Sequence, residues 1–179
     1  TMKLVIASNN KGKIKEFTEL LKPLGYEVVS QRDAGFELDV VEDGETFEEN
    51  SMIKAKAIAA HTDAIVLADD SGLEIDYLDK APGVYSARFM GEDTSYDIKN
   101  QYIMDQVAGK ERGAQYVCVI SYVEEDGTAT SYTGIVRGEI YDRQLGENGF
   151  GYDPIFYYPP MGMSTAQMCP EDKNQVSHR

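Results

Sequence analysis

Short apolar runs that lead directly into polar residues are the feature that most constrains the fold of this sequence. Leu4–Ala7 and Ile65–Ala68 are each four apolar residues long, which is typical of a buried strand. After the first run, a polar turn at residues 8–13 is followed by apolar residues at helical spacing, which end before Pro23 and Gly25. Strands that alternate with helices predict an α/β fold.

A second strand and a second helix follow in the first half. Residues 26–30 are typical of a strand, and residues 46–60 of a helix. Thr46 to Glu49 match the capping-box pattern, with Thr46 as the N-cap and Glu49 reaching back. This second helix is rich in alanine, isoleucine and lysine.

The second half changes to β-rich sequence. Residues 115–124 and 128–140 are long β-rich runs, and Glu125-Asp126-Gly127 between them is a hairpin signal. Residues 155–158 form a last apolar strand, closed by two prolines. The pattern predicts a mixed α/β fold in which helices flank an elongated central sheet.

Composition limits the domain count, the compartment and the partners. A chain of 179 residues with 42% hydrophobic and 27% charged residues is typical of one globular domain, residues 1–179. No window reaches the roughly 18 apolar residues of a membrane span, so no membrane partner is expected. Two cysteines are too few for a disulfide framework and favour a reducing cytoplasm.

The net charge of -14 argues against binding of a nucleic-acid backbone by bulk electrostatics. An acidic protein still binds a small anion where a few lysines converge or a divalent cation bridges. A polyphosphate ligand would therefore bring a metal with it.

The polar turn after the first strand is the first candidate anion site. A helix N-terminus offers unpaired backbone N–H groups and a favourable dipole. Lys11 and Lys13 add charge, Ser8 and Asn10 add short polar groups, and Gly12 allows close approach of the backbone. The segment lacks the spacing of a Walker A loop. The alternative is an ordinary turn between a strand and a helix.

Two adjacent carboxylates, Asp69 and Asp70, form the second candidate. The sequence predicts that the apolar strand from Ile65 ends abruptly at Asp69–Gly72, and ligands bind beyond the carboxyl ends of strands in open α/β sheets. One carboxylate there can hold Mg²⁺ while the other orients or deprotonates water. The alternative is that Asp69 caps a turn and Asp70 is solvated.

The helix at residues 46–60 adds further polar groups. Asn50 and Lys54 are four residues apart and share one helix face. Glu49 suits either the capping box or a metal. Glu42 and Asp43 precede the helix and can approach a cation, although most charge runs are solvated faces.

Aromatic and basic residues near the C-terminus are the remaining candidates. In residues 149–154, two aromatic side chains can stack on a purine ring and Asp153 can contact its polar edge, or the segment is only a tight turn into a strand. Lys173, His178 and Arg179 are either ligands or simply exposed at the chain end. Cys118 on an apolar strand favours a core position over a nucleophile.

Together these segments resemble the inosine triphosphate / xanthosine triphosphate pyrophosphatases. The resemblance spans nearly the whole chain and rests on six motifs in order: Ser8-x-Asn10-x-x-Lys13, Thr46-Phe47-Glu48-Glu49-Asn50 with Lys54-Ala55, Ala68-Asp69-Asp70-Ser71-Gly72-Leu73, Pro82 to Phe89, Phe150 to Phe156, and Lys173 with Ser177-His178-Arg179.

The resemblance implies a fold and an activity. The fold would be the ITPase-like, or anticodon-binding-like, arrangement with a substrate cleft between two lobes. The activity would be Mg²⁺-dependent hydrolysis of deaminated purine nucleoside triphosphates, ITP/dITP and XTP/dXTP, to the monophosphate and pyrophosphate. The partners would be the purine nucleotide and a second copy in a homodimer, with no nucleic acid.

The resemblance also implies residue roles. Asp70 would be the proton acceptor and a Mg²⁺ ligand, and Lys54 would assist at the triphosphate. Ser71 would touch the substrate. The triphosphate would be held by Ser8, Asn9, Asn10, Lys11, Gly12 and Lys13. The base would be surrounded by Phe150, Gly151, Tyr152, Asp153, Lys173, His178 and Arg179. Donors there would select a 6-keto purine, because an amino group in its place is left unpaired.

Two features depart from the family pattern. Val41 stands where the family usually has an acidic metal ligand, and Glu42 is expected to substitute for it. A further helix expected after Arg179 is missing from the sequence. The alternatives are therefore a related pyrophosphatase with another base preference, or a catalytically impaired nucleotide-binding regulatory protein.

Overall fold

The computed structural model describes residues 2–8, 10–36, 40, 44–86, 89–91, 93–149 and 151–177. By their contacts these residues form two compact units. The first unit contains the chain up to Asp70 together with Cys118–Gly134, and the second contains Ser71–Val117 and the chain from Ile135 on.

The strands of the described chain form one mixed sheet, in the order β2-β1-β3-β5-β6-β7-β8 with β4 beside β3. The strands are β1 (Met2–Ile6), β2 (Tyr26–Ser30), β3 (Ile65–Ile75), β4 (Ala81–Pro82), β5 (Gly113–Val123), β6 (Ala129–Ile140), β7 (Phe156–Tyr158) and β8 (Met163–Ser164). The helices are α1 (Lys11–Leu21), α2 (Phe47–Ala59), α3 (Tyr96–Val107) and α4 (Pro170–Val176). The mixed α/β prediction is confirmed.

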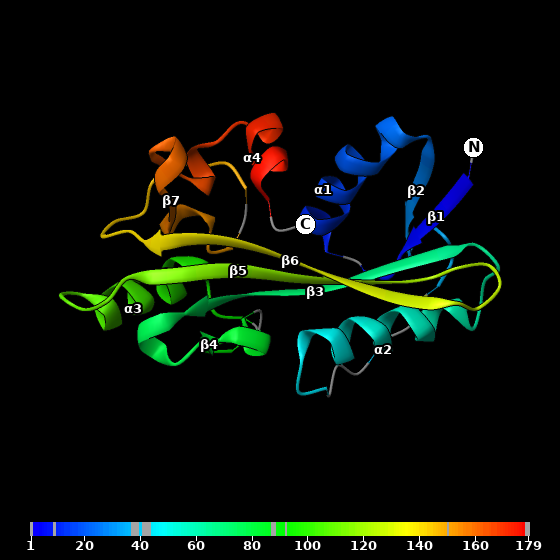
Figure 1. The fold of residues 1–179 in the computed structure, drawn as a ribbon, viewed down its shortest axis with the longest axis horizontal. Helices are drawn as coiled ribbons and strands as arrows, with labels where there is room; N and C mark the ends of the chain where they lie inside the picture. The colour runs from blue at the N-terminus through cyan, green and yellow to red at the C-terminus, as the bar shows by residue number, and fades with distance from the viewer. Residues whose placement is uncertain are drawn as a thin grey trace. The chain divides into compact units, whose positions relative to one another are not determined.

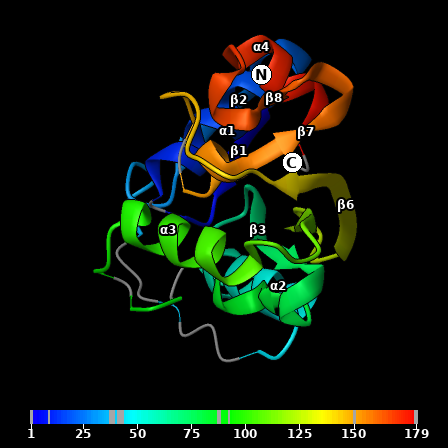
Figure 2. The same ribbon diagram turned by 90° about the vertical axis from the view of Figure 1, so that its left-hand side faces the viewer.

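The first unit is built on parallel strand pairing. β1 pairs with β2 in the register Leu4↔Val28, and with β3 in the register Val5↔Val66. Helices α1 and α2 lie on opposite faces of these strands (Figures 1 and 2). The connections between parallel strands require such crossovers.

Alternation along β1 sends its side chains to both helices. Leu4 and Ile6 belong to one apolar cluster with Phe17 of α1, whereas Val5 belongs to another cluster with Ala55 of α2. A strand that is buried on both faces needs a continuous apolar run rather than an alternating one. This requirement explains the short apolar runs in the sequence.

The second unit has antiparallel pairing and a separate core. β7 pairs with β6 in the register Ile140↔Phe156 and with β8 in the register Tyr157↔Ser164. Its apolar core contains Leu73 and Ile75 of β3, three residues of α3 and Phe156. In the first unit, a Glu124–Thr128 turn joins β5 to β6, as the hairpin signal predicts.

The strand that begins at Ile65 does not end at Asp69. It continues as β3 to Ile75, so the prediction of an abrupt end was wrong. The strand can continue because Leu73 and Ile75 resume the apolar pattern and are fully buried. Asp69 and Asp70 remain within the strand because each carboxylate has a partner, and paired polar groups can be buried.

The start of the second helix follows the predicted capping box with one difference. Thr46 accepts a hydrogen bond from the Glu49 N–H group at 3.1 Å, as expected for an N-cap. The Glu49 carboxylate accepts instead from the N–H group of Glu45, at 2.8 Å, one residue before the N-cap. Glu49 therefore stabilises the approach to the helix.

Candidate active site

The predicted anion loop lies where β1 passes into α1. Asn10 is the N-cap of α1, and its side chain accepts a hydrogen bond from the Lys13 N–H group at 3.2 Å. Ser8 Oγ accepts from the Asn10 N–H group at 3.0 Å. Lys11, Gly12 and Lys13 already belong to the first helical turn, whereas Asn9 lies outside the described residues. The segment thus combines two lysines with the positive end of a helix dipole.

Lys13 forms an ion pair with the first of the two adjacent carboxylates. Its Nζ atom lies 3.2 Å from Oδ1 of Asp69, whose side chain is 1% exposed. The thiol of Cys118 contacts Oδ2 of the same carboxylate at 3.7 Å. Cys118 is fully buried, as its apolar strand predicted. Asp69 therefore holds the lysine ammonium group at the start of α1.

The second carboxylate is bound by a residue of α2. Asn50 Nδ2 donates a hydrogen bond to Oδ2 of Asp70 at 3.1 Å. Asn50 and Asp70 are both buried. Lys54, one turn further along α2, is also buried and donates from Nζ to the backbone carbonyl of Asp69. The predicted shared face of Asn50 and Lys54 is therefore the face that contacts the two aspartates.

Asp69 and Asp70 are adjacent in sequence but serve opposite faces of β3. Asp69 contacts a residue of α1, and Asp70 contacts a residue of α2. The two helices cover opposite faces of the strands (Figure 1), and successive side chains of a strand alternate between faces. The adjacent pair thus supplies one carboxylate to each face.

Few side chains are available as ligands for the expected Mg²⁺ ion. Within the described residues, no three His, Cys, Asp or Glu side chains converge into a set that could hold a metal ion. Glu42, the other expected ligand, lies outside the described residues. Mg²⁺ usually keeps several waters and binds through one or two carboxylates plus substrate phosphates. A single carboxylate such as Asp70 fits that chemistry.

In the second unit, Asp153 is surrounded by donors. Its Oδ2 atom lies 2.7 Å from Lys173 Nζ. Its Oδ1 atom accepts from Tyr116 Oη at 3.0 Å and from Thr165 Oγ1 at 2.8 Å. Asp153 is 3% exposed. Three donors of the protein therefore bind this carboxylate, which in turn orients Lys173.

A small pocket that is open to solvent adjoins this network. The residues that line it are Tyr116, Val136, Asp153, Thr165, Lys173, Val176 and Ser177. Sequence reasoning identified Asp153 and Lys173 but missed Tyr116 and Thr165. No local pattern marks these two residues, because they lie 37 and 12 positions from Asp153.

The aromatic segment before Asp153 is held against α3. Tyr152 meets Tyr96 in a T-shaped contact with ring centroids 5.1 Å apart, and its hydroxyl donates to the Ser86 carbonyl. Burial, with a smaller contribution from Tyr96, raises the pKa of the Tyr152 phenol above its ordinary value. Gly151 has a φ of 67°, and an added Cβ would lie 3.6 Å from the Tyr96 ring.

The remaining predicted residues are placed only in part. Ser71 is half-buried in β3, directly after Asp70. Phe150, His178 and Arg179 lie outside the described residues. Cys118 and Cys169 form no disulfide bond. None of the helices within the described ranges has both the length and the apolarity needed to cross a membrane.

Comparison with known proteins gives consistent matches over the whole chain. A model described as the Ham1 family matches residues 4–179. A dITP/XTP pyrophosphatase of Desulforamulus reducens is 48% identical over 99% of this chain and 90% of its own length. Another from Clostridium perfringens is 42% identical over 99% of this chain and 91% of its own.

Solved structures agree in fold. The Ham1 protein of Staphylococcus aureus is 44% identical and superposes with a TM-score of 0.86, covering 99% of this chain and 92% of its own. The HAM1 protein of Coxiella burnetii is 38% identical with a TM-score of 0.88, covering 100% and 93%.

Proposed function

Because this chain belongs to the Ham1 family, we propose that it is a nucleoside triphosphate pyrophosphatase. Its substrates are the deaminated purine nucleotides ITP/dITP and XTP/dXTP, which it converts to the monophosphate and pyrophosphate and so removes from the nucleotide pool. The observation that carries the proposal is the cluster at the start of α1 and in β3, where Lys13 pairs with Asp69 next to Asp70.

The triphosphate binds at the start of α1. Lys11 and Lys13 lie in the first turn of the helix, where the backbone dipole favours negative charge. Lys54 adds a third ammonium group close to the two aspartates. Three local lysines explain how a chain with a net charge of -14 can bind a polyanion.

Asp70 acts as the proton acceptor. A water oxygen forms a bond to the α-phosphorus while the bond from that phosphorus to the bridging oxygen breaks, and pyrophosphate leaves. The proton of the water passes to the Asp70 carboxylate, as in general base catalysis. Asn50 donates a hydrogen bond to this carboxylate.

Mg²⁺ is the proposed cofactor, held by Asp70 and Glu42. When bound, it neutralises charge on the phosphates and on the departing pyrophosphate. Asp70 fits this role because its carboxylate is an oxygen ligand of the kind that Mg²⁺ prefers.

The base is selected at Lys173. An ammonium group has three donors and no acceptor, and one donor is directed to Asp153. A 6-keto purine offers an acceptor to the ammonium group, whereas the 6-amino group of adenine would place one donor against another. Guanine has the same 6-keto oxygen, so its rejection requires a second contact, such as steric exclusion at C2. Phe150, Gly151, Tyr152, His178 and Arg179 complete the proposed base site.

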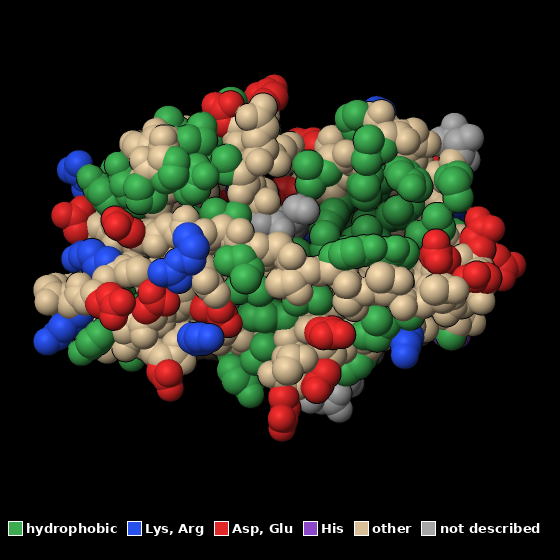
Figure 3. Space-filling model, in the orientation of Figure 1, with side chains coloured by type: hydrophobic (Ala, Val, Ile, Leu, Met, Phe, Trp, Pro, Cys, Tyr) green, Lys and Arg blue, Asp and Glu red, His purple; other side chains and the backbone are tan. Residues whose placement is uncertain are grey.

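We also propose a homodimer. Hydrophobic side chains gather over α1, β1 and β2 on the face shown in Figure 3. In the same unit Tyr132 of β6 is 63% exposed and Met2 is 51% exposed. Exposed apolar surface of this kind favours association. Light scattering after size exclusion would measure the mass of the particle against the 19.9 kDa chain.

The deciding experiment measures pyrophosphate release from ITP, XTP, GTP and ATP, with Mg²⁺ and with EDTA. Metal-dependent turnover of ITP and XTP above GTP and ATP supports the proposal. Tight nucleotide binding without turnover would instead identify a regulatory nucleotide-binding protein. Turnover of other bases would indicate a related pyrophosphatase.

A further inference from the structure

Asn50 bridges a backbone amide and Asp70 through the two ends of its carboxamide. It is 1% exposed. Its Oδ1 atom accepts from the Gly44 N–H group at 2.8 Å, and its Nδ2 atom donates to Asp70 Oδ2 at 3.1 Å. A backbone N–H group can only donate, so the oxygen must face Gly44 and the nitrogen must face Asp70. The orientation of the amide is thereby fixed.

The surroundings of Asn50 leave this arrangement little freedom. Gly44 approaches the helix so closely that an added Cβ would lie 2.7 Å from Glu49 Cβ and 2.8 Å from Asn50 Oδ1. The hydrogen bond from Glu49 N–H to Thr46 fixes the first turn of α2 just before Asn50. The carboxamide is thus held by the helix on one side and by the chain that enters it on the other.

We infer that Asn50 is a positioning residue that sets the rotation of the Asp70 carboxylate for proton acceptance. The torsion about the bond to a carboxylate group is broad and roughly two-fold, so a free aspartate samples many rotations. A hydrogen bond from a rigid donor selects one of them. This inference rests on the proposed function, because it assigns Asn50 to the same reaction.

A positioning role and an anchoring role predict different results for Asn50→Asp. The new carboxylate still accepts from the Gly44 N–H group, so the chain that enters α2 stays anchored. It no longer donates to Asp70, and two carboxylates meet in a buried site. We expect kcat with ITP to fall by about 10- to 100-fold with little change in KM. Anchoring alone predicts a kcat close to that of the wild type.

The exchange variant Asn50→Asp/Asp70→Asn tests the contact without relying on activity. Asn50→Asp alone should lower the Tm by about 5 °C, because like charges are brought together. In the exchange variant the amide at position 70 donates and the carboxylate at position 50 accepts, so one hydrogen bond is restored in the reversed direction. The Tm should therefore return to within about 2 °C of the wild type. The exchange variant should still lack turnover, because the carboxylate stands on the wrong residue.

Ser51→Ala is the matched control. Ser51 is fully buried next to Asn50, and its hydroxyl donates to the Glu48 carbonyl and bonds Ser121 Oγ at 2.6 Å. Neither of these two hydrogen bonds involves Asp70. The Ser51→Ala variant should therefore lose stability and keep its kcat.

The outcomes separate the two proposals. The inference is overturned if Asn50→Asp turns over ITP like the wild type, or if the exchange variant melts no higher than Asn50→Asp. A wild-type protein that releases no pyrophosphate from any nucleotide overturns the proposed function, and with it the catalytic part of the inference. The Tm values still report the contact in that case.

Discussion

Lys173 Nζ lies 2.7 Å from Asp153 Oδ2, and both residues are buried. The other oxygen of Asp153 already accepts from Tyr116 and Thr165. The aspartate therefore holds the Lys173 ammonium group in place. Of the three donors of the Lys173 ammonium group, one is directed to Asp153.

Lys173→Met should lower both stability and base selectivity. Removal of the ammonium group leaves Asp153 buried without its countercharge, which costs about 3–5 kcal/mol of unfolding free energy. The double variant Lys173→Met/Asp153→Asn should recover part of that loss. With ITP, kcat/KM should fall at least about tenfold, while the rate with ATP changes less. Urea denaturation and pyrophosphate release measure the two effects, and equal loss for ITP and ATP would contradict the assignment.

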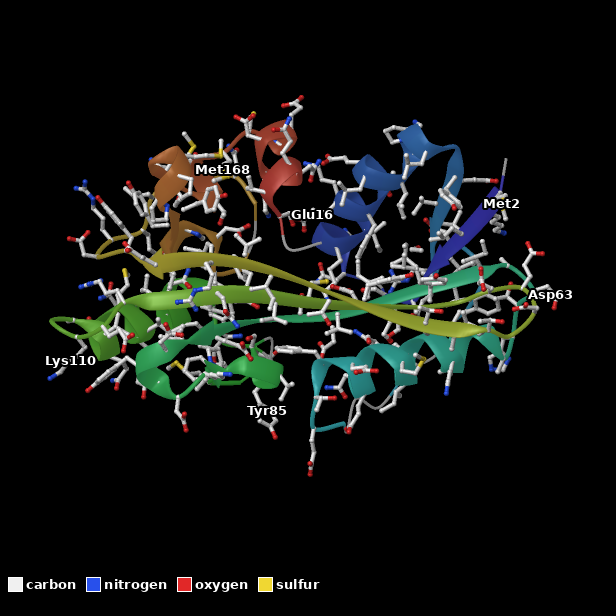
Figure 4. All side chains as sticks on the ribbon, in the orientation of Figure 1. Met2, Glu16, Asp63, Tyr85, Lys110 and Met168 are labelled. Atoms are coloured by element: carbon white, nitrogen blue, oxygen red, sulfur yellow. The ribbon has the colours of Figure 1, made fainter. Side chains whose placement is uncertain are left out.

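Asp70→Asn should keep nucleotide binding and lose turnover. The amide cannot take the proton of the attacking water, so kcat should fall about 100- to 10,000-fold. Binding of ITP, measured by calorimetry, should persist because the lysines remain. Asp63→Asn is the control: Asp63 is exposed, and Figure 4 shows it at the outside of the chain near the start of β3. A fully active Asp70→Asn variant would refute the mechanism.

Lys13→Met should weaken binding of the triphosphate and destabilise the protein. The buried Asp69 loses its charge partner, so unfolding should become easier by about 3–5 kcal/mol. The KM for ITP should rise about tenfold, with a smaller change in kcat. Adding Asp69→Asn should restore stability without restoring the KM, because of these two residues the proposal gives only Lys13 a contact with the phosphates. Recovery of both properties would assign Lys13 a structural role alone.

Asp76 and Arg137 should make stability depend on acid pH. Arg137 donates two hydrogen bonds to the carboxylate, and these, more than its charge, lower the pKa of Asp76. A lowered pKa in the folded state means that the stabilisation is present above the ordinary pKa of 3.8 and is lost as the pH falls through the folded value.

Asp76→Asn should therefore cost stability at pH 7, and this cost should shrink progressively as the pH falls below 3.8. The cost should stay below about 1 kcal/mol, because the Arg137 side chain is 56% exposed and Asp76 is 31% exposed, so solvent screens the pair. Urea denaturation of both proteins across this pH range measures the difference. A difference that is independent of pH would mean that the pair does not titrate as described.

Local pattern sufficed for most elements of the first unit. The apolar run of β1, the Asn10 and Thr46 caps and the Pro23 stop are each decided by neighbours in sequence. The path of β3 was not predictable in this way. Aspartate is depleted in strands, and the partners of Asp69 and Asp70 on α1 and α2 lie far from them in sequence.

The candidate site was predictable in its residue types and less so in its contacts. The motif around Asp153 predicted a group that contacts a base, and that role stays a prediction. The sequence did not predict that the carboxylate accepts hydrogen bonds from Tyr116, Thr165 and Lys173. These donors come from β5, from the segment after β8 and from α4. Hydrogen bonds between distant segments follow from the tertiary fold, which no short motif encodes.

The alternation of β3 makes two identical residues chemically unequal. Asp69 and Asp70 are the same residue type at consecutive positions of one strand. Because consecutive side chains of a strand point to opposite faces, Asp69 pairs with a lysine whereas Asp70 accepts a hydrogen bond from an amide. Deleting one residue from β3 between Ile65 and Asp69 would move each carboxylate to the opposite face. The chain would keep both aspartates and their order while exchanging their environments. The chemical environment of each aspartate therefore depends on its position in the strand as much as on its residue type.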